Sequence, residues 1–155
     1  ILEAVHIVNK SQKLALLPKI KSYFNGNLQG KKLAFWGLAF KPNTDDIREA
    51  PALLLIEKLL KLGAIITAYD PEAMSNAKKK TGNKIEFCTD PYKAIHEADA
   101  LIIATEWSIF RAPDFEKMST LLKDKVIFDG RNLYDLEKMK SLGFKYFSIG
   151  RENIL

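Results

Sequence analysis

The sequence predicts an α/β protein built on a Rossmann-like, doubly wound parallel sheet of about six strands, preceded by a long N-terminal helix. Three observations predict this fold. Short continuous apolar runs, such as residues 100–104, recur along the chain and are typical of strands covered on both faces. Segments with helical periodicity lie between these runs, and short loops join the two. This alternation is most simply a sheet with the strand order 3-2-1-4-5-6.

The first 24 residues have apolar side chains at a helical period with one polar interruption, which predicts an amphipathic helix. Pro18 lacks an N–H group and crowds the preceding turn, so we expect a kink near Leu17 and a second short helix headed by Pro18. A helix of this kind is expected to pack on the domain that follows it. Residues 25–30, rich in Gly and Asn, form the connection to the first strand.

The remaining elements follow from apolar runs and from Gly and Pro at their ends. The best-marked helix has Pro51 in its first turn and Gly63 just beyond its end. The predicted strands are residues 33–36, 65–69, 85–88, 100–104, 126–129 and 146–149. The predicted helices between them are residues 51–62, 72–81, 91–98, 114–122 and 133–141.

The composition indicates one globular domain: 155 residues, of which 47% are hydrophobic and 28% charged. No apolar run approaches the ~20 residues that span a bilayer, so no membrane association is predicted. Cys88 is the only cysteine, which excludes an intrachain disulfide and favours a cytoplasmic setting. We expect Cys88 to be a buried apolar residue and, because neither His6 nor His96 has a ligand-like neighbour, we predict no metal site. The chain starts at Ile1 in mid-pattern and is expected to be a piece of something longer.

The net charge of +5 is confined to the start of the chain. Residues 1–32 contain six Lys and one Glu, whereas the remaining residues contain 18 basic and 18 acidic side chains. A nucleic-acid site needs a charged face on the domain itself. A neutral domain preceded by a basic segment therefore predicts no nucleic-acid binding.

The loop after the first predicted strand, residues 38–49, carries two cations. Lys41 and Arg48 lie there with Asp45, Asp46 and Glu49. Because the carboxyl ends of parallel strands form the ligand site of such sheets, these cations indicate an anionic ligand. The alternative, which the loop alone leaves open, is that they only pair with the neighbouring acids at the surface.

This loop departs from the dinucleotide-binding fingerprint. Gly37 is followed by Leu-Ala-Phe-Lys, so the glycines that cradle a pyrophosphate are missing. Asp70 ends the second strand 33 positions after Gly37, whereas a ribose-binding acid is expected about 20 positions on. We therefore interpret Asp70 as a turn residue and do not expect this sheet to hold NAD alone.

A further cation follows the fifth predicted strand. Arg131 lies in the segment Asp-Gly-Arg-Asn, and in the order 3-2-1-4-5-6 its loop opens at the same edge as the loop of Lys41. One phosphorylated ligand can then contact both, although an ion pair of Arg131 with Asp129 or Asp135 is the alternative. After the fourth strand Trp107 can either wall the cleft or cap the core, and we expect the second because aromatic residues at strand ends mostly pack. We expect Glu106 to order a neighbouring loop without a chemical role.

Four segments carry a resemblance that covers nearly the whole chain in the expected order. They are GLAFKPNTDDIREAP at 37–51, TEW at 105–107, FDGRNLYD at 128–135 and GFKYFSIGR at 143–151. They resemble the C-terminal domain of the nucleotide-sugar dehydrogenases, the UDP-glucose/GDP-mannose dehydrogenase family. The resemblance implies that Phe40, Lys41 and Arg131 contact the nucleotide sugar. It also implies that Arg48 reaches across a cleft to NAD bound on the other domain.

The resemblance also implies a place in a larger protein. Residues 1–27 match the end of a central connecting helix that forms much of a homodimer contact, and residues 28–155 match the UDP-sugar-binding domain. The implied activity is the NAD-dependent oxidation of UDP-glucose to UDP-glucuronate in two hydride transfers, with NAD held mainly by an N-terminal domain. The family's catalytic-cysteine motif is absent, because Cys88 stands between Phe87 and Thr89. No catalytic residue is therefore predicted, and the chain alone is expected to be inactive.

The sequence leaves two alternative functions open. The same domain could serve a dehydrogenase acting on UDP-N-acetylmannosamine or GDP-mannose. The chain could also be a non-enzymatic, nucleotide-responsive or assembly module that dimerises through its basic first helix.

Overall fold

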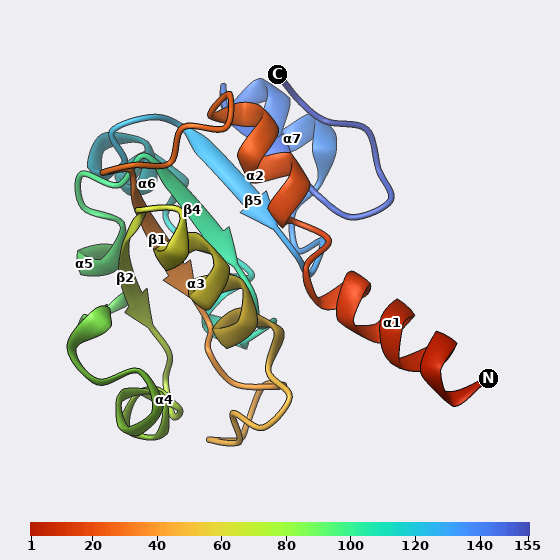
Figure 1. Cartoon of the computed structure of the whole chain (residues 1–155). Coiled ribbons are helices and arrows are strands. Elements are labelled where there is room, and N and C mark those ends of the chain that lie inside the picture. The colour runs from red at the N-terminus through yellow and green to blue at the C-terminus, as the bar shows by residue number, and fades with distance from the viewer.

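A six-stranded sheet forms the centre of the molecule in the computed structural model, which describes residues 1–155 (Figure 1). Its order is β3-β2-β1-β4-β5-β6, and every neighbouring pair of strands is parallel, which confirms the predicted sheet. An isolated antiparallel bridge joins Tyr146 to Ile154 beside the last strand. The strands are β1 (Lys32–Trp36), β2 (Ile65–Tyr69), β3 (Glu86–Phe87), β4 (Ala100–Ile103), β5 (Val126–Asp129) and β6 (Lys145–Phe147).

Helices cover both faces of the sheet. Figure 1 shows α2 and α3 in front of the strands and α5 and α6 behind them. This is the arrangement that right-handed crossovers impose when the chain winds outwards from β1 and then from β4. The helices are α1 (Leu2–Lys13), α2 (Leu17–Tyr23), α3 (Pro51–Lys61), α4 (Met74–Thr81), α5 (Pro91–Ile95), α6 (Phe115–Leu121) and α7 (Leu136–Ser141), with short 3₁₀ turns η1 (Gly82–Lys84) and η2 (Ser108–Phe110).

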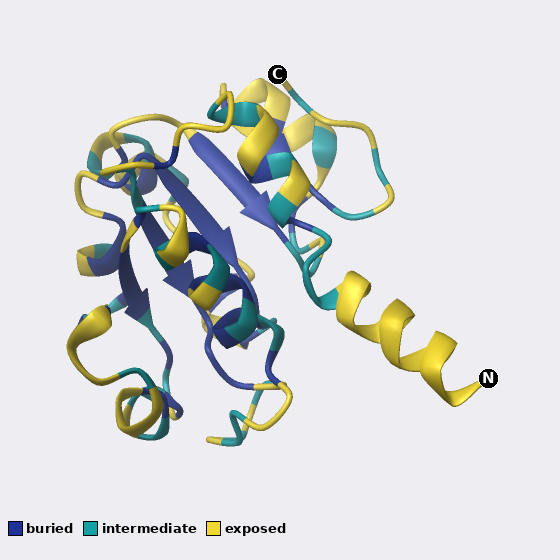
Figure 2. Ribbon diagram, in the orientation of Figure 1, coloured by how far each residue is buried: buried dark blue, intermediate teal, exposed yellow.

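The core is apolar on both faces of the central strands. Leu33 to Trp36 of β1 are almost completely buried, as predicted for a strand covered on both sides (Figure 2). The Trp36 ring stacks on Phe110 at a centroid distance of 5.1 Å, and its indole N–H donates to the Pro91 carbonyl at 2.8 Å. Full burial of each large apolar side chain contributes roughly 1.5–3 kcal/mol, so this core holds the strand ends in place.

Two helices begin later than predicted because carboxylates take up the backbone N–H groups before them. Asp129 accepts from the Leu133 N–H at 2.8 Å, and α7 starts only at Leu136, with Asp135 as its N-cap. Asp70 accepts from the Glu72 and Ala73 N–H groups, and α4 starts at Met74. Apolar periodicity does not reveal these turns.

The N-terminal segment confirms the predicted break and corrects the predicted packing. The helix is interrupted after Lys13, and Pro18 lies in the first turn of α2. Helix α2 packs on the sheet, with Tyr23 in edge contact with Phe128 and Phe147. Helix α1 has no buried residue and projects away from the body (Figures 1 and 2). The expectation that the whole segment packs on its own domain therefore holds for α2 but not fully for α1, which buries no residue and contacts the domain beside α3 and through the ion pair of Lys13 with Glu49.

No helix in the chain is both long enough and apolar enough to cross a membrane.

Candidate functional site at the carboxyl edge of the sheet

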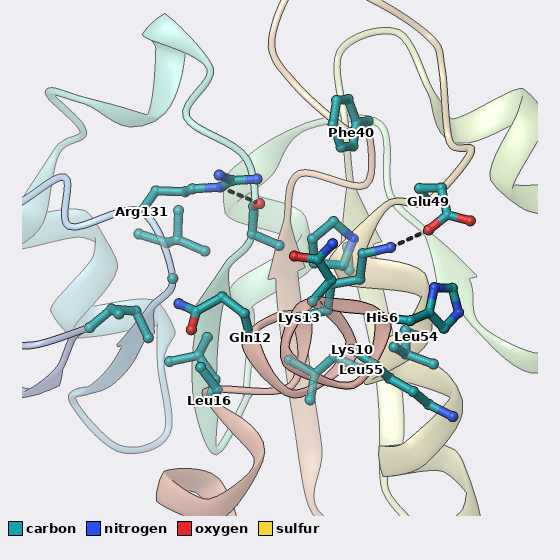
Figure 3. A pocket seen from close by; sticks show the side chains of 18 residues that line it. His6, Lys10, Gln12, Lys13, Leu16, Phe40, Glu49, Leu54, Leu55 and Arg131 are labelled. Carbon is teal, nitrogen blue, oxygen red and sulfur yellow. Dashed lines mark hydrogen bonds and ion pairs between the residues drawn. The ribbon is translucent and has the colours of Figure 1, made fainter. Parts of the chain in front are cut away.

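A cavity of about 680 Å³ opens where β1, β4 and β5 end. Strands β1 and β4 are the neighbours at which the winding of the sheet reverses, and ligands of open α/β sheets bind at this point. Figure 3 shows Arg131 and Phe40 around this hollow, with side chains of α1 below them. The lining residues are His6, Asn9, Lys10, Gln12, Lys13, Ala15, Leu16, Phe40, Glu49, Pro51, Ala52, Leu54, Leu55, Ile103, Ala104, Gly130, Arg131 and Ile149.

Of the three cations predicted for the site, Arg131 is the one that lines this cavity. Its Nε donates to the Ala104 carbonyl at 3.0 Å and lies 3.1 Å from Glu106 Oε2 (Figure 3). The Glu106 oxygen is buried and accepts no hydrogen bond, so this contact is an ion pair. The two terminal nitrogens of the guanidinium have no partner in the chain. The guanidinium group is therefore held at its Nε, and its two terminal nitrogens are left free to donate hydrogen bonds.

The acid that pairs with Arg131 differs from both predicted candidates. Asp129 does not contact the guanidinium; its Oδ1 accepts from the Arg131 backbone N–H at 2.8 Å. Asp135 is the N-cap of α7. Glu106, which was expected only to order a loop, is the ion-pair partner. It lies after β4 rather than near Arg131 in sequence, so no local pattern could have identified it.

Buried Asp129 organises the loop that carries Arg131. Its Oδ2 accepts from the Leu133 N–H at 2.8 Å and from the Tyr146 hydroxyl at 2.6 Å. Burial, together with the nearby Asp129 carboxylate, raises the pKa of Tyr146 above its ordinary value. The phenol therefore stays protonated and remains a donor to Asp129. Sequence reasoning missed this role of Tyr146, because it depends on the parallel pairing of β5 with β6.

Phe40 and Lys41 follow the buried residues Leu38 and Ala39 in the β1 loop, but only Phe40 lines the cavity. Phe40 lines the cavity and is 45% exposed. Its N–H donates to the Asp46 carbonyl at 2.8 Å, which folds the loop back on itself. Lys41 is exposed, has no ion pair, and is not among the residues that line the cavity. The structure thus brings Phe40 and Arg131 together and leaves Lys41 outside the hollow.

Arg48 lies on the outer surface of the same loop, away from the cavity. Its Nε and Nη2 bind the two carboxylate oxygens of Asp46 at 3.0 and 2.9 Å. The hydrogen bonds from Arg48 lower the pKa of Asp46 to about 2. Nearby, Glu49 forms an ion pair with Lys13. The surface pairing considered for this loop therefore holds for Arg48 with Asp46 but not for Lys41, and Glu49 pairs instead with a lysine of α1.

Helix α1 supplies polar residues that sequence reasoning did not assign to the site. His6, Lys10 and Lys13 all line the cavity (Figure 3). They are spaced i, i+4 and i+7, which places them on one helix face, and this spacing could have identified them from the sequence.

Cys88 is buried, and its burial raises the pKa of the thiol, which is consistent with a structural cysteine. No group of three His, Cys, Asp or Glu side chains is arranged to hold a metal ion.

Fold and site together define a class. The chain is a Rossmann-like α/β domain with a cavity at its switch point and without the glycine cradle of a dinucleotide site. It belongs to the UDP-glucose/GDP-mannose dehydrogenase family, since residues 34–136 match the model of that family's UDP-binding domain. The predicted family resemblance is thereby confirmed.

Relatives of known name agree with this assignment. The chain is 42% identical over 151 residues to UDP-glucose 6-dehydrogenase of Rhizobium meliloti, which covers 97% of this chain and 34% of that protein. It is 43% identical to the Pseudomonas aeruginosa enzyme of the same name, with 97% and 34% covered. A UDP-glucose dehydrogenase structure from Pyrobaculum islandicum superposes with a TM-score of 0.76 at 31% identity, covering 88% of this chain and 30% of that one. The chain thus spans about a third of the length of these relatives.

Proposed function

We propose that this chain is the UDP-sugar-binding domain of an NAD-dependent UDP-glucose 6-dehydrogenase that oxidises UDP-glucose to UDP-glucuronate. The observation that carries the proposal is Arg131, whose terminal guanidinium nitrogens are unpaired in a cavity at the switch point of the sheet. A guanidinium fork with two open donors suits a diphosphate or vicinal hydroxyls, which it can bind through two parallel hydrogen bonds. The names of the relatives support the choice of substrate.

In this proposal the domain holds the nucleotide end of the substrate. Arg131 binds the diphosphate or sugar hydroxyls, and the exposed Phe40 ring offers an apolar surface across the hollow. Lys41 has no partner within the chain, so its flexible stem is free to bring the ammonium over a bound anion. Holding the sugar in one orientation lowers the barrier to reaction elsewhere by several kcal/mol.

The reactive groups belong to other parts of the proposed full-length protein. NAD would accept hydride, but the β1 loop does not fit it, since the Leu38 and Ala39 N–H groups already donate to Asp70. Of the residues in this chain, Arg48 is the one we assign to a contact with NAD held by an N-terminal domain. No catalytic residue is assigned here, and the lone Cys88 is consistent with a reducing, cytoplasmic setting.

Residues 1–27 are proposed to be the end of a helix connecting the two domains, and residues 28–155 to be the UDP-sugar domain. The exposed apolar side chains of α1, including Val5 and Val8 at 52% and 65% exposure, support a homodimer contact along this helix. Analytical ultracentrifugation of the full-length protein with Val5→Asp tests this contact, and a dimer of unchanged stability would exclude it.

Substitution of Arg131 tests the proposed function. Arg131→Ala in the full-length protein should raise the KM for UDP-glucose about 10- to 100-fold, since a charge-assisted hydrogen bond is worth ~1.5–3 kcal/mol. Arg131→Lys should restore only part of the loss because it keeps the charge but not the fork. Arg111→Ala is the matched control, since Arg111 is exposed and does not line the cavity. Equal KM values for Arg131→Ala and Arg111→Ala would exclude Arg131 from the site.

Two alternative functions have specific support. A UDP-D-ManNAc dehydrogenase structure from Pyrococcus horikoshii superposes with a TM-score of 0.70 at 27% identity, covering 92% of this chain and 31% of that one. Competition among UDP-glucose, UDP-N-acetylmannosamine and GDP-mannose in the full-length protein separates the sugars. The exposed cationic α1 supports a non-enzymatic assembly module. A dinucleotide fingerprint and a catalytic-cysteine motif in the coding sequence upstream of Ile1 would exclude that module.

A further inference from the structure

Three loops of the carboxyl edge meet at one buried carboxylate. Asp70 follows β2 and has no exposed surface. Its Oδ2 accepts hydrogen bonds from Leu38 N at 2.7 Å and from Ala39 N at 3.0 Å, both in the β1 loop. The same oxygen accepts from Trp107 Nε1, after β4, at 3.1 Å.

The second carboxylate oxygen is also fully engaged. Oδ1 accepts from Glu72 N at 2.9 Å and from Ala73 N at 2.8 Å, in the turn before α4. All five partners of Asp70 are N–H donors, so the side chain serves only as an acceptor. This is the hydrogen-bonding pattern of an ionised carboxylate.

The two β1-loop donors are the groups that a dinucleotide fold turns towards a ligand. In such folds the backbone N–H groups after the first strand bind the pyrophosphate. Here the Asp70 carboxylate lies against these groups instead, and Leu38 and Ala39 are buried with it. An internal anion therefore stands where the ligand's phosphate would otherwise be bound.

The same turn is fixed from its other side by the β4 loop. The Thr105 hydroxyl donates to the Ala39 carbonyl at 2.8 Å. Gly37 has φ +95°, and a Cβ there would lie 2.5 Å from Thr105 Cβ, so only glycine allows this approach. Both polar groups of Ala39 are thus bonded by buried side chains immediately before Phe40 and Lys41.

We propose that Asp70 is a positioning residue of the nucleotide-sugar site. Its carboxylate occupies the anion position of the β1 loop and holds the Leu38–Ala39 turn, so that the chain leaves the turn with Phe40 facing the cavity shared with Arg131. The inference rests on the proposed function, because Phe40 and Arg131 matter only if that cavity binds the nucleotide sugar. It assigns a role in ligand binding to a residue that touches no ligand.

The test compares two buried aspartates in the full-length protein. Asp70→Asn replaces one acceptor oxygen by an NH₂ group, which leaves at least two of the five N–H donors without a partner. Asp99→Asn is the matched control. Asp99 is 5% exposed and its carboxylate accepts from the Lys32 N–H at 2.8 Å, but at the opposite, amino edge of the sheet. Both substitutions lower stability, and only the first disturbs the β1 loop.

The measurements are the KM and kcat with UDP-glucose, the Kd of UDP by calorimetry, and amide hydrogen exchange. Asp70→Asn should raise the KM and the Kd about 10-fold, within the ~100-fold that misplacement of binding groups can cost, and change kcat much less. Exchange at Leu38 and Ala39 should accelerate. Asp99→Asn should leave the Kd of UDP within about twofold of the wild-type value, because a loss of stability alone does not change the site.

Thr105→Val is a milder second variant if Asp70→Asn folds poorly. It removes only the hydroxyl that holds the Ala39 carbonyl and should raise the Kd of UDP about threefold, as expected for one neutral hydrogen bond. If Arg131→Ala weakens UDP binding while Asp70→Asn and Thr105→Val leave it unchanged, the inference is overturned and the proposed function stands. If Arg131→Ala also leaves UDP binding unchanged, both are overturned.

Discussion

The two loops that carry the predicted site residues are held in different ways. The loop after β5 is bonded to the core: Asp129 accepts from Arg131 N, and Arg131 Nε contacts Ala104 and Glu106. The loop after β1 is bonded to the core only at its base, through Asp70 and Thr105. Further out it is held by contacts at the surface: the local pair of Arg48 with Asp46, the ion pair of Glu49 with Lys13, and the hydrogen bond from the Asn76 side chain to the Asp45 carbonyl.

This difference shows which of the predicted cations the fold itself orients. Arg131 is half-buried and its direction is set by neighbouring elements, so little rotamer entropy is lost when it binds an anion. Lys41 and Arg48 are exposed: Lys41 has no ion pair in the chain, and the Arg48 side chain is held only by its surface pair with Asp46. The contrast predicts that substitutions near Arg131 have large effects and that those in the outer β1 loop have small ones.

The largest effect is expected at Asp129. Asp129→Asn replaces an acceptor of three hydrogen bonds in a fully buried position and should lower the free energy of unfolding by about 3 kcal/mol. It should also raise the KM for UDP-glucose, because the amide keeps one acceptor oxygen and the loop that carries Arg131 loses at least one of these hydrogen bonds. Urea denaturation measures the first effect. Asp135→Asn is the control: Asn is as good an N-cap as Asp, so the change there should stay below ~0.5 kcal/mol. Equal destabilisation by the two substitutions would contradict the comparison.

A smaller effect is expected from the ionisation of Tyr146. Burial raises its folded-state pKa above the ordinary value of 10, so the folded state retains a proton that the unfolded state loses. The resulting stability is fully present below pH 10 and should fall by about 1.4 kcal/mol per pH unit above it. Tyr146→Phe should be less stable at pH 8, since it lacks the bond to Asp129, yet lose less stability between pH 10 and 11. Parallel pH profiles for wild type and variant would show that Tyr146 is not the group responsible.

The smallest effect is expected at Arg48. Its pair with Asp46 is solvent-exposed, and pairs of that kind contribute little to folding. Arg48→Ala should leave thermal unfolding and the Kd of UDP nearly unchanged while raising the KM for NAD in the full-length protein. Lys145→Ala, at an exposed position of β6, is the control. A rise in the Kd of UDP for Arg48→Ala would place Arg48 in the UDP site and contradict its assignment to NAD.

Much of the fold could be predicted because it depends on local patterns. The apolar runs of β1, β4 and β5 and the Pro51–Gly63 frame of α3 identify these elements without knowledge of their neighbours. The position of Arg131 just after a buried strand likewise placed it at the ligand edge of the sheet. The starts of α4 and α7 were predicted too early, because Asp70 and Asp129 take N–H groups that periodicity assigns to a helix.

The candidate site was only partly predictable. Phe40 and Arg131 were predicted from sequence and lie around one cavity, whereas Lys41 lies outside it. Glu106 as the partner of Arg131 was not predicted. The contribution of α1 to the lining was missed as well, because the direction of α1 depends on the break before α2.

The sequence by itself determined the order of strands, the family, and the absence of a glycine cradle in the first loop. Each of these can be recognised from residues that are adjacent or regularly spaced along the chain. Only the tertiary structure decided which acid pairs with Arg131, which N–H groups Asp70 satisfies, and that α1 lines the cavity without burying any of its residues. The physical reason is that a parallel sheet brings the ends of strands from distant parts of the chain to one edge. Contacts made across that edge depend on distances in space that no spacing in sequence encodes.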